Sequence, residues 1–466
     1  MSPPTASRGS SVPRATAVEV GEGAAGPMAG RRASLRGSSV PHATAAAAGW
    51  VVFLVAVLLL FAGEGWGSSF FIPDSGTRAL ARGGAFAVEA SDLSAIYYNP
   101  AGLTRLCGHH LYLSLGQTFN PVRYIPAGAP EGAVENRLLL NPNLVGGYAF
   151  GGERITVALG IFTPSGQGSY RYPDEGAQRY TVKTYTIRHF FVGGAVGWRL
   201  SQNLHLGLGV SNSTVLNRYR FDHNPFSTAG EAPGYDMAID IDVADRFAPA
   251  FLIGLRWHPH PLLEVGVSFQ PGLTLDLSGV QRMEATGQIL QAIFESGGKN
   301  TRQTEAVELF MNFPPILRTG LRFLLSPQFD LEVNGVYEGW HVQESLQIVY
   351  LDRNEEATIP RNLSDGFSLR IGGSAHLGGG WSVSAGWFLD TNAIPPETMI
   401  PSFVDGNEIG VSGGIESIRH WGGKAFRIGI AAAGLLPQTI ENHTSRAPGR
   451  YELRFAKVAF SLATRF

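Results

Sequence analysis

The sequence predicts an all-β fold: a transmembrane antiparallel β-barrel of about 14 strands, with a small N-terminal hatch inside its lumen. Three observations lead to this class. Apolar side chains alternate with polar or small ones from about residue 109 onward, the connections alternate between short and long, and one apolar stretch near the N-terminus has the layout of a signal peptide. The mean hydropathy of +0.03 is too low for a bundle of membrane helices, each of which needs about 20 apolar residues. A barrel exposes only every second residue to lipid, so its average hydropathy is that of a soluble protein.

The composition argues against several classes of function. The 466 residues carry a formal net charge of −2, which gives no support for nucleic-acid binding. Cys107 is the only cysteine, so neither an intramolecular disulfide nor a multi-cysteine metal site can form. We therefore expect no cofactor, no metal site and no catalytic residue.

Residues 1–67 form a leader that we exclude from the fold. Its apolar region, residues 50–62, reads WVVFLVAVLLLFA and is too short to span a bilayer comfortably as a helix. Three arginines between residues 31 and 36 precede it and small residues follow it, which is typical of a signal peptide cleaved after Gly67. A single membrane anchor is the alternative.

Segments of about ten residues show the period-two alternation of strands. In NLHLGLGV, leucines at 204, 206 and 208 lie on one face and glycines at 207 and 209 on the other. RFAPAFLIGLRWH (246–258) and LLEVGVSFQ (262–270) repeat the scheme. A soluble sandwich would alternate in the same way, so strand length and the pattern of the connections must discriminate.

The connections alternate in length along the chain. Six short turns lie at 151–153, 201–203, 258–261, 326–328, 378–380 and 420–424. Seven long loops lie near 120–136, 164–181, 218–245, 272–305, 350–365, 390–408 and 436–450. Thirteen connections join fourteen strands. Because this count is even, the chain enters the first strand and leaves the last strand on the same side of the membrane. Short periplasmic turns and long outside loops are typical of the outer membrane of a Gram-negative bacterium.

The C-terminal segment AKVAFSLATRF places Val458, Phe460, Leu462 and the terminal Phe466 on one face. It resembles the signal by which bacterial barrels are recognised for insertion, and an ordinary last strand is the alternative. We expect the barrel-assembly machinery and outer-membrane lipid among the partners of the chain.

The hatch is expected at residues 68–108, before a barrel of residues 109–466. Its segment GGAFAVEASDLSAIYYNPAGLTRL, from Gly83 to Leu106, is rich in small residues and too polar to span a membrane. A lumen of fourteen strands needs filling, unlike one of eight. This segment resembles the N-terminal hatch of the FadL family of outer-membrane transporters. GIFTPSGQGSYRYPD (160–174), NFPPILRTGLRF (312–323) and GWFLDTNAIPPETMIP (386–401) are also similar to stretches of that family.

The resemblance implies a passive channel for a hydrophobic small molecule, a long-chain fatty acid or an aromatic hydrocarbon. It implies a hatch motif at Asn99, Pro100 and Ala101, and an exit sideways into the membrane through a kink in the third strand, expected at 153–162. Proline removes a backbone donor and restricts the residue before it, so the motif is a hinge or a plain structural turn. Gly160 could permit the kink, because glycine weakens strands.

A capture site for the ligand is expected on the outside loops. In the loop at 272–305, one helical face carries Met283, Ile289, Leu290, Ile293 and Phe294. The expected companion is the loop at 218–245, with Phe221 and Phe226. Simple packing of one loop on the other is the alternative. The odd or even position of a residue in the period-two alternation, which we call its parity, also places four arginines on inward faces of the barrel, at positions 256, 318, 322 and 370.

Two other functions compete with transport. A structural or secretion-associated barrel would use the same scaffold without transport, and an apolar lumen site beneath the loops would argue against it. A lipid hydrolase would need a nucleophile, and GVSGG (410–414) matches the pattern of one at Ser412. That pattern requires a strand, a turn and a helix, whereas this segment lies in an expected strand.

Overall fold

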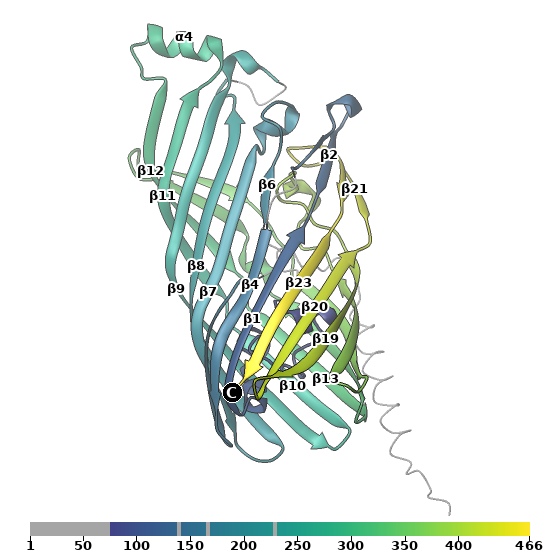
Figure 1. Cartoon of the computed structure of the whole chain (residues 1–466). Coiled ribbons are helices and arrows are strands. Elements are labelled where there is room, and N and C mark those ends of the chain that lie inside the picture. Colours follow the sequence, from purple (N-terminus) through teal and green to yellow (C-terminus); the bar gives the residue numbers. More distant parts are fainter. Residues whose placement is uncertain (1–74, 138–140, 165–167, 227–230) are drawn as a thin grey trace, which may run out of the picture. The chain divides into compact units, whose positions relative to one another are not determined.

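The structure, a computed structural model, describes residues 75–137, 141–164, 168–226 and 231–466. In this part of the chain, fourteen antiparallel strands close into a barrel, because β1 pairs with β4 on one side and with β23 on the other (Figure 1). The predicted fold class and strand count are confirmed. The strands are β1 (Gly108–Phe119), β4 (Asn141–Gly151), β5 (Ile155–Phe162), β7 (Thr184–Arg199), β8 (Leu204–His223), β9 (Met237–His260), β10 (Leu263–Gln270), β13 (Ile316–Ser326), β14 (Phe329–Glu338), β17 (Gly366–His376), β18 (Trp381–Asp390), β19 (Glu408–Trp421), β20 (Lys424–Leu435) and β23 (Ala456–Arg465).

The six predicted short turns join strands at one end of the barrel, which we call the periplasmic end. The predicted signal peptide, its cleavage site and the first residues of the expected hatch lie outside the described residues. Among the described helices, none is long and apolar enough to cross a bilayer.

The outer face of the barrel is apolar and its inner face is small or polar. On β8, Leu208 and Val210 face outward and about half of each side chain is exposed, whereas His205 faces inward and is buried. Exposed tryptophans and a phenylalanine lie near the periplasmic end, at Trp198, Trp257, Trp381, Trp421 and Phe466. An apolar outside with an aromatic girdle is typical of a barrel in lipid and excludes the soluble sandwich.

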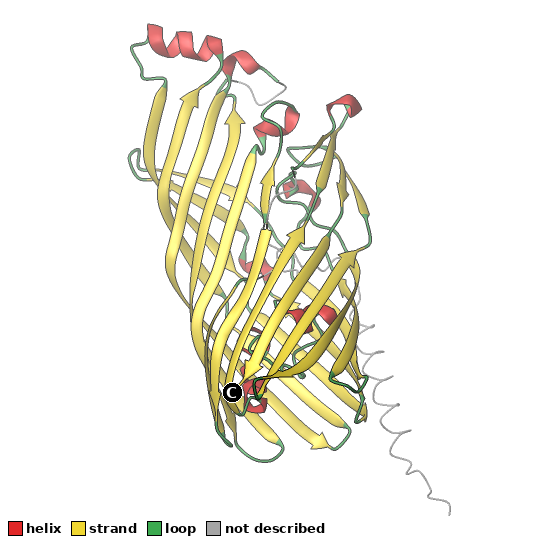
Figure 2. Ribbon diagram, in the orientation of Figure 1, coloured by secondary structure: helices red, strands yellow, loops and turns green. Residues whose placement is uncertain are grey.

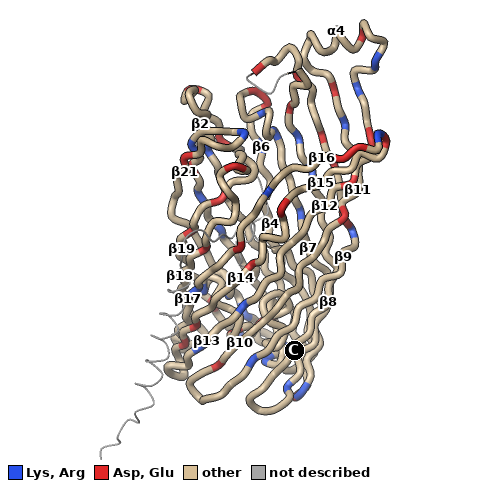
Figure 3. Tube along the Cα trace, turned by 180° about the vertical axis from the view of Figure 1, so that it is seen from behind, with Lys and Arg blue, Asp and Glu red and all other residues tan. Residues whose placement is uncertain are grey.

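One side of the wall extends far beyond the barrel at the opposite, long-loop end (Figure 1). The extension is built by the upper parts of β8 and β9 together with β11 (Leu273–Ala285), β12 (Arg302–Phe313), β15 (Ser345–Tyr350) and β16 (Glu355–Pro360). Charged residues are frequent on its strands (Figure 3).

The expectation of loops at 218–245, 272–305 and 350–365 is therefore wrong for much of their length. Pro271 separates β10 from β11, and Pro314 and Pro315 separate β12 from β13. Proline is typical of strand ends, yet both strands resume beyond it with unchanged register: Gln270 pairs with Ile316, and Leu273 with Phe313.

A separate four-stranded sheet joins the first and last long loops. It contains β2 (Val122–Pro126), β3 (Val134–Glu135), β21 (Gln438–Asn442) and β22 (Gly449–Leu453). The remaining elements at this end are the short strand β6 (Ser169–Arg171), the helix α4 (Gln288–Ser296) and the 3-10 helices η2 (Pro130–Gly132), η3 (Ala177–Tyr180), η4 (Pro233–Tyr235), η5 (Trp340–Val342) and η6 (Pro396–Thr398).

The hatch lies inside the lower half of the barrel (Figure 2). Its described part, residues 75–107, contains α2 (Thr77–Ala81), α3 (Ala95–Tyr98) and η1 (Pro100–Arg105), and most of its side chains are buried. Glycines on neighbouring strands let its backbone approach the wall: a Cβ at Gly207 would lie 2.2 Å from Ala101 N, and one at Gly372 2.2 Å from Arg82 O.

Buried charges hold the hatch to β14. Arg82 forms an ion pair of 2.8 Å with Asp330, and the carboxylate of Glu332 accepts hydrogen bonds from the backbone N–H groups of Val88 and Glu89. Removing one partner of such a buried pair typically costs about 3–5 kcal/mol. The hatch is therefore an integral part of the barrel interior.

Candidate ligand-binding site in the barrel lumen

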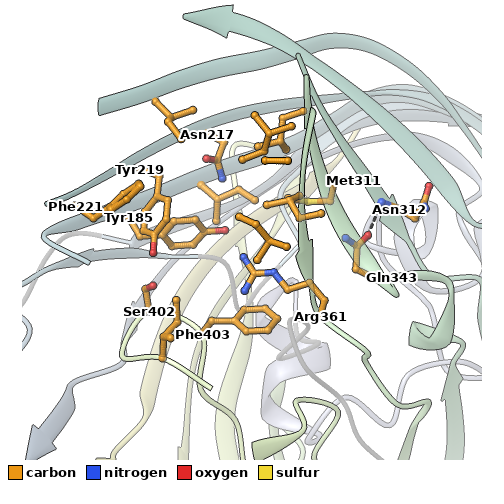
Figure 4. Close-up of a pocket in the computed structure, with 18 of the residues that line it drawn as sticks. Tyr185, Asn217, Tyr219, Phe221, Met311, Asn312, Gln343, Arg361, Ser402 and Phe403 are labelled. Carbon is orange, nitrogen blue, oxygen red and sulfur yellow. Dashed lines mark hydrogen bonds between the residues drawn. The ribbon is translucent and has the colours of Figure 1, made fainter. Parts of the chain in front are cut away.

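An apolar cavity lies in the lumen beneath the long loops (Figure 4). Its volume is about 170 Å³, and the empty space between its walls, including the open mouth, is about 1140 Å³. Inward-facing residues of β7, β8, β9, β11 and β12 form one wall, and the β15–β16 hairpin forms another. The apolar lining consists of Ile187, Phe221, Ile241, Leu309, Met311, Phe313, Trp340, Leu346, Ile348, Ala357, Ile359, Ile400 and Phe403, with Tyr185, Tyr219 and Tyr350.

The loop of residues 391–407, between β18 and β19, closes one side of the cavity, and we call it the roof loop. Ile400 and Phe403 exchange backbone hydrogen bonds of 3.0 and 2.8 Å, which fixes a tight turn. The hydroxyl of Tyr172 donates a hydrogen bond of 2.9 Å to Pro401 O. The roof loop is thereby tied to the loop that follows β6.

The guanidinium of Arg361 is the one positive charge among the residues that line this cavity. Its carbon lies 4.3 Å from the centroid of the Phe403 ring, and the side chain extends among Tyr185 and Tyr219 (Figure 4). Within the part of the chain that the structure describes, no carboxylate forms an ion pair with it. Burial lowers the pKa of the Arg361 guanidinium, which means that the charge is poorly solvated. A partly desolvated cation in an apolar cavity is suited to bind one anionic group.

Polar groups near the cavity floor are already paired. Gln343 accepts a hydrogen bond of 2.6 Å from Asn312 N through its Oε1 atom and donates one of 3.0 Å to Ser345 O. Trp340 donates its indole N–H to Glu338 at 2.9 Å. These residues shape the cavity, and Arg361 supplies its charge.

A continuous series of rings leads from the cavity down to the hatch. Phe313 lies 5.2 Å from His189, His189 lies 4.4 Å from Phe191, and Phe191 lies 4.9 Å from Phe162, between ring centroids. Phe162 in turn lies 5.4 Å from Tyr97 of the hatch. We call these residues the aromatic ladder, and it offers an apolar surface along the lumen.

The four inward arginines predicted from parity have different surroundings. Arg256, Arg322 and Arg370 are within ion-pair distance of acidic residues, at 3.9, 2.9 and 2.7 Å. Arg318 instead lies over the Tyr97 ring at 5.0 Å, is buried, and has no hydrogen-bond partner at Nη1 among the described residues. A second arginine without an ion pair among the described residues therefore lies at the lower end of the aromatic ladder.

The hatch motif is fixed against the wall. The Asn99 side chain caps η1 by accepting a hydrogen bond of 3.1 Å from Ala101 N, and it donates to Ala87 O at 2.7 Å and Leu255 O at 3.1 Å. Pro100 begins η1, which suits a residue without a backbone N–H.

The expected capture residues fall into three places. Phe221 lines the lumen cavity. Met283 belongs to β11 rather than to a helix, because pairing with β12 continues past it. The others lie at the tip of the extension, where α4 is capped by Gly297 and packs on η4. Leu290 is buried, Phe294 is half-buried, and Ile289, Ile293 and Phe226 are exposed. We call Phe226, Ile289 and Ile293 the tip patch.

The third strand is interrupted beyond Gly160. That glycine lies in regular register, opposite Gly147 and Gly193. β5 ends at Phe162, and β6 resumes the pairing with β7 only at Ser169. Between these points the described ladder of β7 with β5 and β6 is interrupted, and we call this interruption the first gap.

Ser412 does not form a nucleophile site. It lies within β19, without the strand, turn and helix that a nucleophile elbow needs, and its hydroxyl donates a hydrogen bond of 3.3 Å to Ala81 O of the hatch. Among the described residues, no group of three His, Cys, Asp or Glu side chains is arranged to hold a metal ion.

Known proteins share this architecture. The chain has the fold of a Pseudomonas aeruginosa FadL homologue, with a TM-score of 0.72, 15% identity, and coverage of 86% of this chain and 99% of that one. It also has the fold of the Pseudomonas putida toluene transporter TodX, with a TM-score of 0.67, 11% identity, and coverage of 85% of this chain and 99% of that one. The Ralstonia pickettii toluene transporter TbuX has the same fold, with a TM-score of 0.65, 15% identity, and coverage of 85% of this chain and 99% of that one. A stretch of 125 residues is 24% identical to NMB0088, an outer membrane protein of Neisseria meningitidis serogroup B, and covers 25% of this chain and 26% of that protein. The chain thus spans about a quarter of that relative.

The model of one protein family matches residues 58–415, which is more than half of the chain. Its members are described as outer membrane protein transport proteins. The family and these structural neighbours are transporters rather than enzymes, and the apolar barrel surface agrees with a place in the outer membrane. The chain belongs to the OMPP1/FadL/TodX family of outer-membrane transport proteins.

Proposed function

We propose that this protein is a passive channel for apolar molecules that carry a single anionic head group, with long-chain fatty acids as the principal class. The observation that carries the proposal is Arg361, a guanidinium without a carboxylate partner among the described residues, in a cavity of otherwise apolar and aromatic lining. A carboxylate would complete the ion pair, and the acyl chain would occupy the apolar space.

Aromatic hydrocarbons are the second candidate class. TodX and TbuX are toluene transporters, and an apolar cavity of about 150 Å³ can take up benzene, so the lumen cavity of about 170 Å³ has room for one ring. A neutral hydrocarbon would gain nothing from the charge of Arg361. The presence of that charge favours the fatty acid.

The proposed route begins outside the membrane. The tip patch exposes apolar side chains at a distance from the lipid, where they serve as a low-affinity capture surface. The ligand then enters the lumen cavity and moves down the aromatic ladder toward Tyr97 and Arg318. It leaves sideways into outer-membrane lipid at the first gap, whose edge is formed by Phe162 and His189.

The hatch rearrangement in this route is local. Residues 82–89 and 99–105 are held by ion pairs such as Arg82–Asp330 and Arg105–Glu264. Residues 90–98 form no ion pair among the described residues, although Ser268 donates a hydrogen bond of 2.6 Å from the wall to Tyr98 O. We therefore take residues 90–98 as the segment that can move. Ala90, at one end of this segment, has a φ of 23°, a conformation that costs an alanine about 1–2 kcal/mol. Release of this strain would favour movement of the segment.

Uptake by cells tests the proposal. Radiolabelled oleate and toluene are supplied to a Gram-negative bacterial strain that lacks its own transporters for these compounds and expresses this protein or its Arg361→Gln variant. We expect the protein to raise oleate uptake and the variant to lose most of that gain, whereas any toluene uptake is equal in both. Arg353→Gln, at a loop arginine paired with Glu305, is the matched control. Oleate uptake no higher than that of the empty strain would overturn the proposal and favour a structural barrel.

A further inference from the structure

The barrel wall has a second interruption, between β9 and the strand formed by β10 and β11. The last pair of β9 with β10 is Ile253 with Phe269, and the first pair of β9 with β11 is Ala244 with Ser278. Between them, residues 245–252 of β9 and 270–277 of β10 and β11 have no ladder partner across this seam in the described chain. On their other sides most residues of both edges stay paired, with β8 and with β12 and β13. We call this interruption the second gap.

The edges of the second gap are adapted to missing ladder bonds. An unpaired backbone N–H in lipid is costly, and both edges contain a proline, Pro249 and Pro271, which has no N–H. Asp245 accepts hydrogen bonds of 2.9 Å from Phe247 N and from Asp276 N, across the seam. Arg246 and Phe247 form a bulge that shifts the register between β8 and β9 by one residue. These features indicate a built opening.

The outer side of the second gap is apolar. Phe247 is 76% exposed and Phe251 is 47% exposed. Phe251 pairs with the outward-facing Val210 of β8 and so lies at the same level of the wall. These side chains face the lipid, because they lie on the face that carries the exposed leucines of the barrel. A molecule that passed through the gap would therefore enter hydrocarbon rather than water.

A narrow crevice joins the second gap to the hatch and to the aromatic ladder. Its lining includes Ile96 and Tyr97 of the hatch, Phe162 and Phe191 of the ladder, and Ala250 and Gln270 from the two edges of the gap. The crevice has a volume of about 10 Å³, the space of one water molecule. It is closed to a ligand in this state, and small residues in its walls, such as Gly194, Gly209 and Ala250, leave it free to widen.

We propose that the second gap is an additional lateral exit, through which the apolar ligand passes from the foot of the aromatic ladder into the lipid on the side of β9. This inference rests on the proposed transport function. Three strands, β7, β8 and β9, lie between the first gap and the second gap, and both gaps are reached from Tyr97. Movement of hatch residues 90–98 would open both routes at once.

Cross-linking across the seam tests the second exit. In a Cys107→Ser background, Phe251→Cys with Pro271→Cys occupies the positions that an unbroken ladder would pair. Ile253→Cys with Phe269→Cys, two residues further along each strand, is the control pair in the closed ladder. Each pair is joined in cells by a membrane-permeable bifunctional thiol reagent, the joined fraction is measured by mass spectrometry, and oleate uptake is compared before and after joining.

We expect uptake to fall when the gap pair is joined, to about half for two equal exits, and to stay unchanged for the control pair. Ala250→Trp, which fills the crevice without a cross-link, should lower uptake in the same way. If oleate uptake is unchanged after the gap pair has been joined, the second exit alone is overturned. If the two cysteines do not join, unchanged uptake by Ala250→Trp overturns it in the same way. Absence of oleate uptake by the unaltered protein overturns the proposed function as well.

Discussion

The guanidinium of Arg361 lies 4.3 Å from the centroid of the Phe403 ring, so that a loop arginine and the roof loop meet inside the lumen cavity. The contact orients the cation without neutralising it, because an aromatic face offers only part of the stabilisation of a carboxylate. The roof loop thereby holds the charge in the position where a ligand head group would arrive.

Arg361→Gln should weaken oleate binding to the purified protein by about 10-fold or more, since a hydrogen bond to a charged group is worth about 1.5–3 kcal/mol. Binding of methyl oleate, which has the same chain and no charge, should be unchanged. Titration calorimetry or displacement of a fluorescent fatty acid measures both. Equal losses for the acid and the ester would show that the substitution damaged the cavity rather than removed a charge partner.

Gly254→Ala should unseat the hatch motif. A Cβ at this position would lie 2.1 Å from Asn99 Oδ1, so Asn99 would lose hydrogen bonds to Ala87 O and Leu255 O. Overpacking of this kind costs about 1–3 kcal/mol. We expect higher ion conductance in planar bilayers and a lower melting temperature. Gly413→Ala, where the new Cβ would lie 3.6 Å from its nearest neighbour, is the matched control, and an identical conductance in both variants would contradict the account.

The roof loop should loosen as the pH rises. Burial raises the pKa of the Asp405 carboxyl well above its usual range, and Asp390 and Glu338 raise it further. The folded state then binds a proton more tightly than the unfolded state, whose pKa is about 3.9, so the roof loop loses stability as the pH climbs from that value to the raised pKa. The protection factors of residues 391–407, which are ratios of the intrinsic, base-catalysed hydrogen-exchange rate to the observed rate, should be higher at acidic than at alkaline pH. Asp405→Asn should abolish the difference, and a difference that persists in the variant would assign it to another group.

Ile289→Ser combined with Ile293→Ser should reduce uptake at low oleate concentration several-fold and leave oleate binding to the lumen cavity unchanged. Both side chains are more than 40% exposed, so their loss should not affect folding. Leu377→Ser, at an apolar residue that is 63% exposed at the periplasmic end, controls for surface polarity. If the double variant takes up oleate as well as this control does, the tip patch is a packing surface only.

The barrel could be predicted from the sequence because one physical rule governs every strand: lipid on one side requires an apolar residue at every second position. The same rule explains the errors. Pro271 and Pro314 look like strand ends, yet the upper ribbon resumes beyond them with the same register. Parity says nothing about such resumption, because it depends on pairing with β9, whose partner residues are distant in the sequence.

The binding site was less accessible to sequence reasoning. Arg318 has an inward parity, but whether an arginine lacks an acidic partner depends on side chains from other strands. Arg361 follows β16 in a segment that reads as a loop, where alternation gives no direction. Its apolar surroundings come from β7, β8, β12 and the roof loop, which only the closed barrel brings together.

The structure of the protein crystallised with oleate tests the central claim most directly. We predict electron density for the acyl chain in the lumen cavity, between β12 and the β15–β16 hairpin, with the carboxylate within hydrogen-bond distance of the Arg361 guanidinium. Density for oleate elsewhere on the barrel with the lumen cavity empty, or a carboxylate that points away from Arg361, would contradict the account.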